Sequence, residues 1–339
     1  MTTQVTRPEW YRAIAHYQKP DLRKAIWQLV NTFVPYFGLW ALMVWLLRRG
    51  TSYWLVLPLI VLAAGFLVRI FIFFHDSCHG SFFASRRANR ILGYVSGILA
   101  FTPYEYWRRS HAGHHATAGD LDRRGGGDVW TMTVEEYRAA VWWKRVAYRT
   151  MRNPVVLFVL GPFFVFIVGQ RFSQRGMPRR ERNSVIVTNL ALLAIAVAAS
   201  LTIGLRTYLI IQLPAMLIAG SIGLWLFYVQ HQFEGVYWKR NERWDPVEAA
   251  LEGSSYYRLP KVLQWFSGNI GLHHIHHLRA RIPNYNLQRC YDEMVPLHVR
   301  PLTLRTSLKS MWLNLYDEER GKLVGFRALR RQPEPSPLP

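Results

Sequence analysis

The chain has 339 residues, half of them hydrophobic, and its 42 lysine and arginine residues outnumber 21 acidic ones, which gives a formal net charge of +21. No zinc-finger, homeodomain or RNA-recognition pattern accompanies this charge, which argues against a nucleic-acid-binding module. The two cysteines are too few for a disulfide framework or a CxxC metal site. The basic residues instead flank apolar segments, as the positive-inside bias of membrane proteins predicts.

Residues 1–26 are too polar for a cleavable signal and are predicted to be a cytosolic segment. Four later stretches are apolar and long enough to cross a bilayer, which takes about 17–25 residues in a helix. They are residues 27–47, 50–74, 185–205 and 207–230. The predicted fold class is therefore an all-α integral membrane protein, with four transmembrane helices in two hairpins and a cytosolic helical cap.

Two further apolar runs, residues 91–101 and 154–170, are too short or too interrupted to be assigned as spans. If residues 154–170 crossed the membrane, His231 would lie on the opposite face from His75, and the arginine-rich loop that follows would lie outside. The positive-inside bias disfavours that arrangement. We therefore predict re-entrant or interfacial segments, with both termini on the cytoplasmic side.

Residues 27–300 are predicted to form one domain. Apolar residues recur at helical spacing over 302–316, so residues 301–328 are predicted to be a cytosolic helical extension. Packing of this helix on the soluble cap is the preferred interpretation, and a helix on the membrane surface is the alternative. The Pro-rich end, residues 329–339, is predicted to be disordered.

Nine of the twelve histidines fall into four places, at or just past the ends of apolar segments. HDSCH contains His75 and His79, HAGHH contains His111, His114 and His115, HQFE contains His231, and HHIHH contains His273, His276 and His277. Spacings of three and four residues place side chains on one face of a helix, so each HxxHH is predicted to aim three imidazoles at one point.

Neutral imidazole is a common ligand of iron, copper, zinc and nickel. Nine imidazoles exceed what one metal ion needs, and they suit two ions that each keep an open position. His274 points about 100° away from its neighbour on a helix and is not predicted to be a ligand. His16 and His298 fit no pattern.

The ligand type does not exclude zinc, but a paired site made of histidine at a membrane edge favours redox iron and O2 chemistry. Cys78 lies within HDSCH, one position from His79, and would face elsewhere. A thiolate-bound cluster or haem is therefore not predicted.

At these residues the sequence resembles the membrane fatty acid desaturases, over roughly residues 30–300. The matching segments are HDSCHGSFF, WRRSHAGHHATAGDLDRRGGGDVWT, FYVQHQFE and SGNIGLHHIHHLRARIPNYNL. The three residues between the first two histidines are similar to the delta-12 (omega-6) and bacterial acyl-lipid branch. The resemblance implies four transmembrane helices, a cytosolic cap and a centre of two iron ions. Its implied ligands are His75, His79, His111, His114, His115, His231, His273, His276 and His277.

Metal-bound imidazoles usually donate their other N–H to a carboxylate or carbonyl. Asp76 and Glu234 are the preferred candidates, and Asp120 is a further one; Glu105, Asp122 and Asp128 also lie near the histidines. The alternative role of these carboxylates is ion pairing with nearby arginines. The resemblance also implies an asparagine that approaches one iron through water. Asn269 is the candidate, and capping of a helix is its alternative role.

The predicted reaction introduces a cis double bond into a membrane-embedded acyl chain, using O2. Side-chain acids and bases cannot remove hydrogen from unactivated methylenes, so the metal ions carry the chemistry and no catalytic residues beyond the ligands are predicted. The sequence has no dinucleotide fingerprint, haem module or cysteine-rich cluster, so we expect a separate electron donor, a ferredoxin or a cytochrome b5-like protein. The basic surface is suited to attract an acidic donor, or alternatively lipid headgroups.

Three other functions are weighed against this one. The same ligands suit a di-iron hydroxylase or ketolase of an alkyl or carotenoid substrate. A membrane metal carrier is disfavoured, because a transport path needs polar residues within the spans and only Arg69, near one end, is charged. A structural membrane scaffold would not explain nine histidines.

Overall fold

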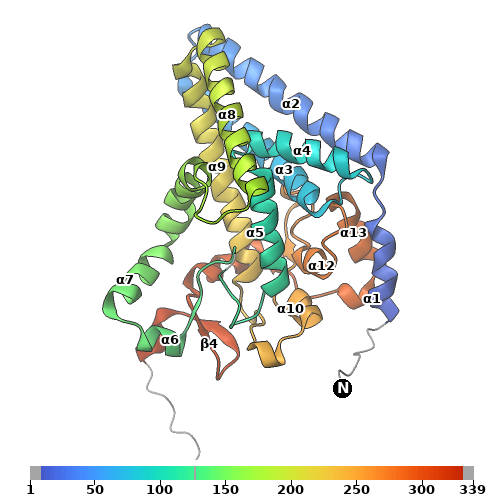
Figure 1. Cartoon of the computed structure of the whole chain (residues 1–339), viewed down its shortest axis with the longest axis vertical. Helices are drawn as coiled ribbons and strands as arrows, with labels where there is room; N and C mark the ends of the chain where they lie inside the picture. The colour runs from blue at the N-terminus through green and yellow to red at the C-terminus, as the bar shows by residue number, and fades with distance from the viewer. Residues whose placement is uncertain (1–8, 126, 331–339) are drawn as a thin grey trace, which may run out of the picture.

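The computed structural model describes residues 9–125 and 127–330. Four helices in it are long and apolar enough to cross a membrane. They are α2 (Leu22–Arg48), α3 (Tyr53–His79), α8 (Arg179–Thr202) and α9 (Leu205–His231). Because α2 packs on α3 and α8 on α9, they form the two predicted hairpins, which α3 and α9 join (Figure 1). The predicted fold class, a helical membrane protein with four spans, is confirmed.

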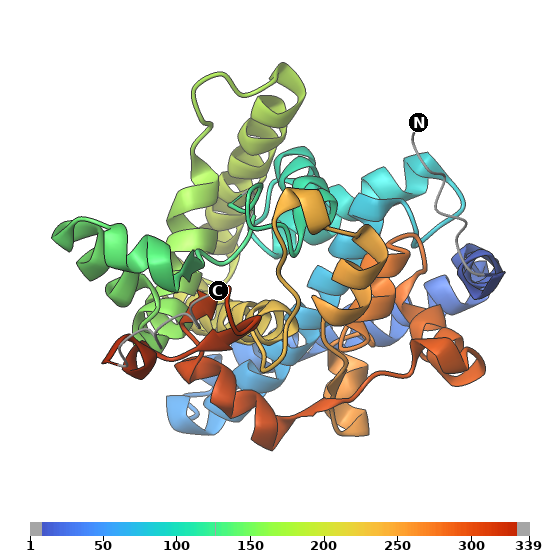
Figure 2. The same ribbon diagram turned by 90° about the horizontal axis from the view of Figure 1, so that it is seen from below.

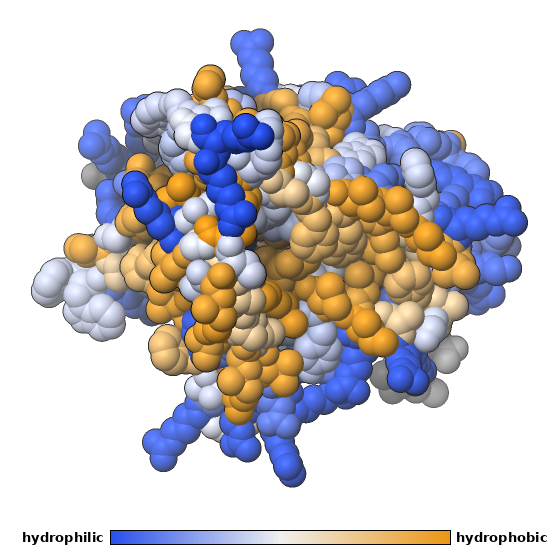
Figure 3. Space-filling model, turned by 90° about the horizontal axis from the view of Figure 1, so that it is seen from above, coloured by the Kyte–Doolittle hydropathy of each residue, from blue (hydrophilic) through white to orange (hydrophobic). Residues whose placement is uncertain are grey.

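The central helix of this bundle is α3. Within its most apolar window 56% of the residues are buried, against 17% in α2 and in α8. The outer helices therefore expose large apolar side chains where lipid would lie. Seen from the end of the bundle, hydrophobic residues gather across the middle of the face and hydrophilic ones project at its rim (Figure 3).

Local signals set where the long helices begin and end. The Asp21 carboxylate caps α2 by accepting hydrogen bonds from the backbone N–H groups of Arg23 and Lys24. Gly80 ends α3 with a φ of +67°, a backbone conformation that glycine adopts at low cost. Because α3 continues to His79 and α9 to His231, the spans themselves carry three of the nine histidines out of the apolar layer.

Shorter elements complete the fold, and most of them lie where α3, α5 and α9 end, at the lower part of the view in Figure 1, whereas α4 lies higher, beside α3. The helices are α1 (Glu9–Ala13), α4 (Arg86–Leu99), α5 (Tyr104–Thr117), α6 (Val134–Ala139), α7 (Trp142–Met151), α10 (Pro246–Glu252), α11 (Lys261–Phe266), α12 (His273–Leu278), α13 (Asn284–Glu293) and α14 (Leu304–Ser307). The strands are β1 (Met132–Thr133), β2 (Tyr257–Arg258), β3 (Leu302–Thr303), β4 (Leu315–Asp317) and β5 (Lys322–Val324). β4 pairs parallel with β1 and antiparallel with β5, and β2 pairs parallel with β3.

The two apolar runs that were not assigned as spans take different forms. Residues 91–101 lie mostly in α4, which packs along α3. Residues 154–170 lie in two π-helical stretches, Val156–Leu160 and Phe163–Val168, that end in a short 3-10 helix. With α7 these stretches form a pair bent by 64°, which is either a broken fifth span or a re-entrant loop.

Residues 301–328 differ from the predicted helical extension. Helix there is limited to α14 and two 3-10 segments, Leu308–Trp312 and Phe326–Arg330, and residues 315–324 form the β4–β5 hairpin. Tertiary partners decide this, because β1 offers β4 a backbone edge and the Tyr148 hydroxyl donates to the Asn314 carbonyl. The apolar stripe of Leu304, Leu308 and Trp312 is 43%, 53% and 69% exposed, so it does not pack on the cap as preferred.

The close contact between α4 and α5 predicts that a larger residue at Gly93 destabilises the protein. A Cβ on Gly93 would lie 2.2 Å from the Tyr104 ring, which cannot move easily because it is buried and its hydroxyl donates to the Ser77 carbonyl at 3.0 Å. We expect Gly93→Ala to destabilise the protein by about 1–3 kcal/mol, as overpacked cores do. The midpoint of unfolding in detergent measures this. Gly38→Ala is the control, since nothing lies within 4 Å of its Cβ; equal midpoints for the two variants would contradict the prediction.

Candidate metal centre

Four elements bring the nine histidines together. α3 contributes His75 and His79 from its last turns, α5 contributes His111, His114 and His115, α9 ends on His231, and α12 contributes His273, His276 and His277. These elements come from widely separated parts of the chain and meet near the lower ends of α3 and α9 (Figure 1). Six of the nine side chains are buried; His79, His115 and His277 are partly exposed.

The histidines divide into two groups whose donor atoms lie within 4.8 Å of one another. The first group has five members, His75, His79, His111, His115 and His276. The second group has four members, His114, His231, His273 and His277. We refer to them as the five-histidine group and the four-histidine group.

This division corrects the expectation that each HxxHH box aims at one point. In α5 the i, i+4 pair His111 and His115 joins the five-histidine group, while His114 turns to the other. In α12 the assignment is reversed, because the i, i+4 pair joins the four-histidine group and His276 joins the five-histidine group. Adjacent helix positions differ by about 100°, so a box of this spacing can serve two neighbouring points.

Two imidazoles of the four-histidine group, those of His114 and His231, point their Nε2 atoms at each other. His114 Nδ1 lies 2.5 Å from the Asp128 carboxylate, and His231 Nδ1 lies 3.2 Å from the Gly253 carbonyl oxygen. Both partners accept, so both Nδ1 atoms carry the proton, and in a neutral ring Nε2 is then bare. Yet the two Nε2 atoms are 3.1 Å apart. Two lone pairs at that distance repel unless a cation lies between them, so these residues fit a metal ion.

The spacing of the donors also bears on the kind of metal. Nε2 atoms are 3.0–3.1 Å apart between His231 and His273 and between His273 and His277, and likewise between His115 and both His111 and His276. With metal–nitrogen bonds of about 2.1 Å, ligands at right angles lie about 3.0 Å apart and tetrahedral ligands about 3.4 Å apart. A group of five donors also exceeds the four positions of a tetrahedral zinc site.

Burial keeps five of the histidines outside the spans neutral. Removal from water, and secondarily the neighbouring imidazoles, lower the pKa of these side chains well below the usual value. The residues are His111, His115, His273, His276 and His277. The neutral ring is the form that binds a metal.

The carboxylate that contacts a histidine most closely is Asp128, which was weighed but not preferred from the sequence. It lies in a glycine-rich loop fourteen residues after His114, where no helical or strand period relates the two. Asp76 is buried and lies 3.4 Å from His75 Nδ1, but its stronger contacts are with the backbone and side-chain nitrogens of Asn284, at 2.7 and 2.9 Å.

The other candidates lie elsewhere. Asp120 is fully buried, and its carboxylate accepts from the backbone of Asp122 and from Arg123. Glu234 has a side chain 75% exposed and faces Lys309 at 3.6 Å. Asn269 has a φ of +59° and donates to the Asn284 carbonyl at 3.0 Å. None of these contacts within the described residues involves a histidine, and their roles at the metals stay predictions.

His274 lies outside both groups, as expected from its angle on the helix. Its Nε2 donates to the Leu297 carbonyl at 2.9 Å, which holds α12 against the chain that follows α13.

Comparison with known proteins adds independent findings. The family model described as fatty acid desaturase matches residues 51–304. A fatty acid desaturase of Bacillus subtilis is 49% identical over 323 residues, which cover 95% of this chain and 91% of the relative. An sn-1 oleoyl-lipid 12-desaturase of Synechocystis is 26% identical and covers 71% of this chain and 69% of the relative. An sn-1 acyl-lipid omega-3 desaturase (ferredoxin) of Synechocystis is 25% identical, with 72% and 68% covered.

Proposed function

Because this chain belongs to the fatty acid desaturase family, whose members are oxidoreductases, we propose that it is an O2-dependent di-iron desaturase of membrane lipids. It introduces a cis double bond into an acyl chain that lies in the bilayer. The observation that carries the proposal is the pair of adjacent histidine groups, whose ring nitrogens converge on two points at the ends of the spans. The relatives that act on oleoyl-lipid and acyl-lipid support a lipid-linked substrate.

The nine histidines would hold the two metals, five around one and four around the other. Bound iron would supply the activation of O2 and the removal of hydrogen from two adjacent methylenes. The balanced reaction takes one O2, two electrons and two protons, and yields the double bond and two waters. The two groups adjoin at His115 and His277, whose rings stack with centroids 4.1 Å apart. One acyl chain can therefore pass close to both groups.

Aromatic side chains orient the ligands and keep water away. Trp107 stacks on the His111 ring with centroids 4.2 Å apart, and it also contacts the rings of Phe71, Phe74 and His75 of α3. Phe227 packs against the His114 ring at 5.2 Å. A dry, fixed surrounding is what a reactive metal centre requires of the protein.

We propose that the metal centre and both termini face the cytoplasm. Exposed arginines gather where α4 and α8 begin, at Arg86, Arg87, Arg179, Arg180 and Arg182. This is the side of the bundle that carries the histidines, and the positive-inside bias places such a side in the cytoplasm.

A separate donor would supply the electrons. One relative is named as ferredoxin-dependent, which supports a ferredoxin; a cytochrome b5-like protein is the alternative. Arg90 of α4, Arg108 of α5 and Arg180 of α8 surround the buried Glu105 and are 57%, 42% and 59% exposed, so positive charge gathers where these three helices meet. Such a surface attracts acidic proteins over long range.

Expression in a bacterial host of known lipid composition, together with a ferredoxin and its reductase, tests the function. Mass spectrometry of the membrane fatty acids is expected to show a new double bond that is missing with His276→Ala. A hydroxylated or ketonic product would contradict desaturation. If no product forms, the iron content of the purified protein decides whether the di-iron assignment stands.

A further inference from the structure

The β4–β5 hairpin, residues 315–324, packs against the segments that follow two of the helices that carry the histidines. It begins after residue 304, where the match to the family model ends. In the view from below it lies beside the segments that leave α5 and α9, the helices that carry His114 and His231 (Figure 2).

These two segments are joined directly to each other. The backbone N–H of Leu121 donates to the Lys239 carbonyl, and that of Lys239 donates to the Gly119 carbonyl, each at 2.9 Å. The Trp244 indole N–H donates to the Ala118 carbonyl at 3.0 Å. Hydrogen bonds therefore join the segments that follow the two histidine-bearing helices.

The hairpin covers this junction. Leu121, Val236, Trp238, Tyr316 and Leu323 form one cluster in which each side chain is at most 4% exposed. The Tyr316 hydroxyl also donates to the Trp238 carbonyl at 2.9 Å.

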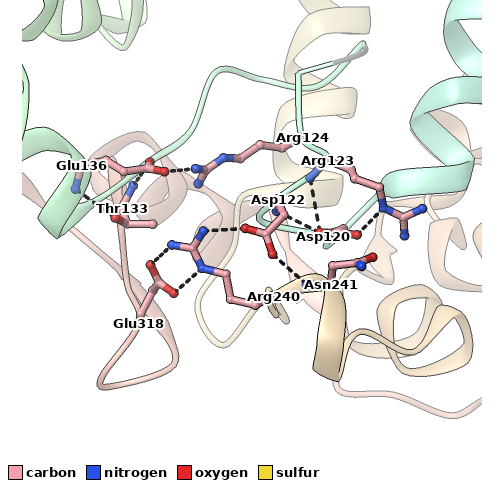
Figure 4. Close-up of polar contacts among 9 residues, drawn as sticks. All are labelled: Asp120, Asp122, Arg123, Arg124, Thr133, Glu136, Arg240, Asn241 and Glu318. Atoms are coloured by element: carbon pink, nitrogen blue, oxygen red, sulfur yellow. Dashed lines mark hydrogen bonds and ion pairs between the residues drawn. The ribbon is translucent and has the colours of Figure 1, made fainter.

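Ion pairs close the junction at its outer edge (Figure 4). The Arg240 guanidinium makes two hydrogen bonds to the Glu318 carboxylate, at 2.9 and 2.5 Å, and one to Asp122 at 2.6 Å. The backbone N–H of Asn241 donates to the same Asp122 carboxylate at 2.9 Å. An isolated ion pair this exposed stabilises a protein little. Here one guanidinium binds Glu318 through two hydrogen bonds and Asp122 through a third, so it fixes the relative position of three segments.

The same hairpin also holds the far end of the loop that leaves α5. Met132 and Thr133 of β1 pair with Leu315 and Tyr316 of β4. Within the loop Arg124 pairs with Glu136, which caps α6 together with Thr133 (Figure 4). Between the anchors at Asp122 and Met132 lie the glycines that precede Asp128. Glycine segments lose much backbone entropy when they are ordered, so anchors at both ends reduce that cost.

We infer that the β4–β5 hairpin and Arg240 act as a clasp that positions Asp128 against His114 and so fixes the four-histidine group. Arg240, Asp122 and Glu318 are positioning residues, because they act through the loop and their described contacts include none of the nine histidines. The inference rests on the proposed function only in taking His114 to be a metal ligand.

Hydrogen exchange of the full-length protein, with or without metal, tests whether the hairpin holds the loop that carries Asp128. Glu318→Gln keeps the side chain's shape but removes its charge. We expect amides of residues 121–130 to exchange about three- to tenfold faster, because the anchor at Asp122 loosens. Arg320→Gln is the matched control, since within the described part of the chain the ion pair of Arg320 is with Asp317 of its own hairpin, at 3.8 Å. Unchanged exchange in Glu318→Gln, or an equal change in the control, would overturn the clasp.

A double-mutant cycle on iron release to a chelator tests the coupling to the metal. Glu318→Gln alone is expected to speed release from one of the two sites about three- to tenfold, less than the tenfold or more expected for loss of a direct partner of a ligand. On an Asp128→Asn background the same change is expected to add nothing, because the clasp acts through Asp128. Independent, additive effects would mean that the hairpin is only a structural support. If the wild-type protein binds no iron, the proposed function fails, while hydrogen exchange still decides whether the hairpin holds the loop.

Discussion

Replacing His231 by alanine is expected to abolish double-bond formation and to remove one of the two bound metal ions. His231 sits in the smaller group, and its Nε2 lies 3.1 Å from that of His114 and 3.0 Å from that of His273. Its loss leaves three imidazoles around that metal, whereas loss of a member of the five-histidine group leaves four. In His231→Ala we therefore expect the metal of the four-histidine group to be lost while the other metal is retained.

The measurement is iron per chain in the purified protein, beside fatty acid analysis of the cells that express it. His298→Ala is the matched control, because His298 is exposed and its described contact is with the Tyr291 carbonyl. It should keep the wild-type iron content and product. Full iron content in His231→Ala would show that this side chain does not bind metal and would contradict the assignment of the four-histidine group.

Asp128→Asn is expected to weaken metal binding or desaturation by about 10–100-fold, the usual effect of removing a carboxylate that holds a metal-bound histidine. The carboxylate lies 2.5 Å from His114 Nδ1, so it fixes the tautomer and makes Nε2 a stronger donor. Asparagine has nearly the same shape but no charge. The Asp128→Asn protein should therefore fold normally but bind the metal of the four-histidine group more weakly.

Iron release to a chelator, followed over time, measures this effect separately for the two sites. We expect one phase to accelerate and the other to stay as in the wild type. Asp292→Asn is the control, because that carboxylate is exposed on α13 and accepts a hydrogen bond from Gln288. Acceleration of both phases in Asp128→Asn would point to general unfolding rather than to the His114 contact.

The resemblance to membrane fatty acid desaturases, drawn from four histidine segments, is confirmed by the family match and by the relative from Bacillus subtilis. The four spans are confirmed as well, although α2 begins five residues before the predicted span at residue 27 and α3 runs on to His79. Charged ends such as Lys24 lie within a helix but outside an apolar window. Hydropathy therefore locates a span better than it locates the helix that contains it.

The sequence by itself determined the features that follow from local periods: the lengths of the apolar helices and the residues that share a helix face. It therefore singled out all nine histidines that the structure gathers. Only the tertiary structure decided how each HxxHH box divides between two groups, which carboxylate lies against His114, and that residues 315–324 form a hairpin rather than a helix. These outcomes depend on contacts between residues far apart in the chain. The path of a glycine-rich loop places Asp128, and β1 offers the edge on which β4 forms, and neither leaves a repeat that local sequence can reveal.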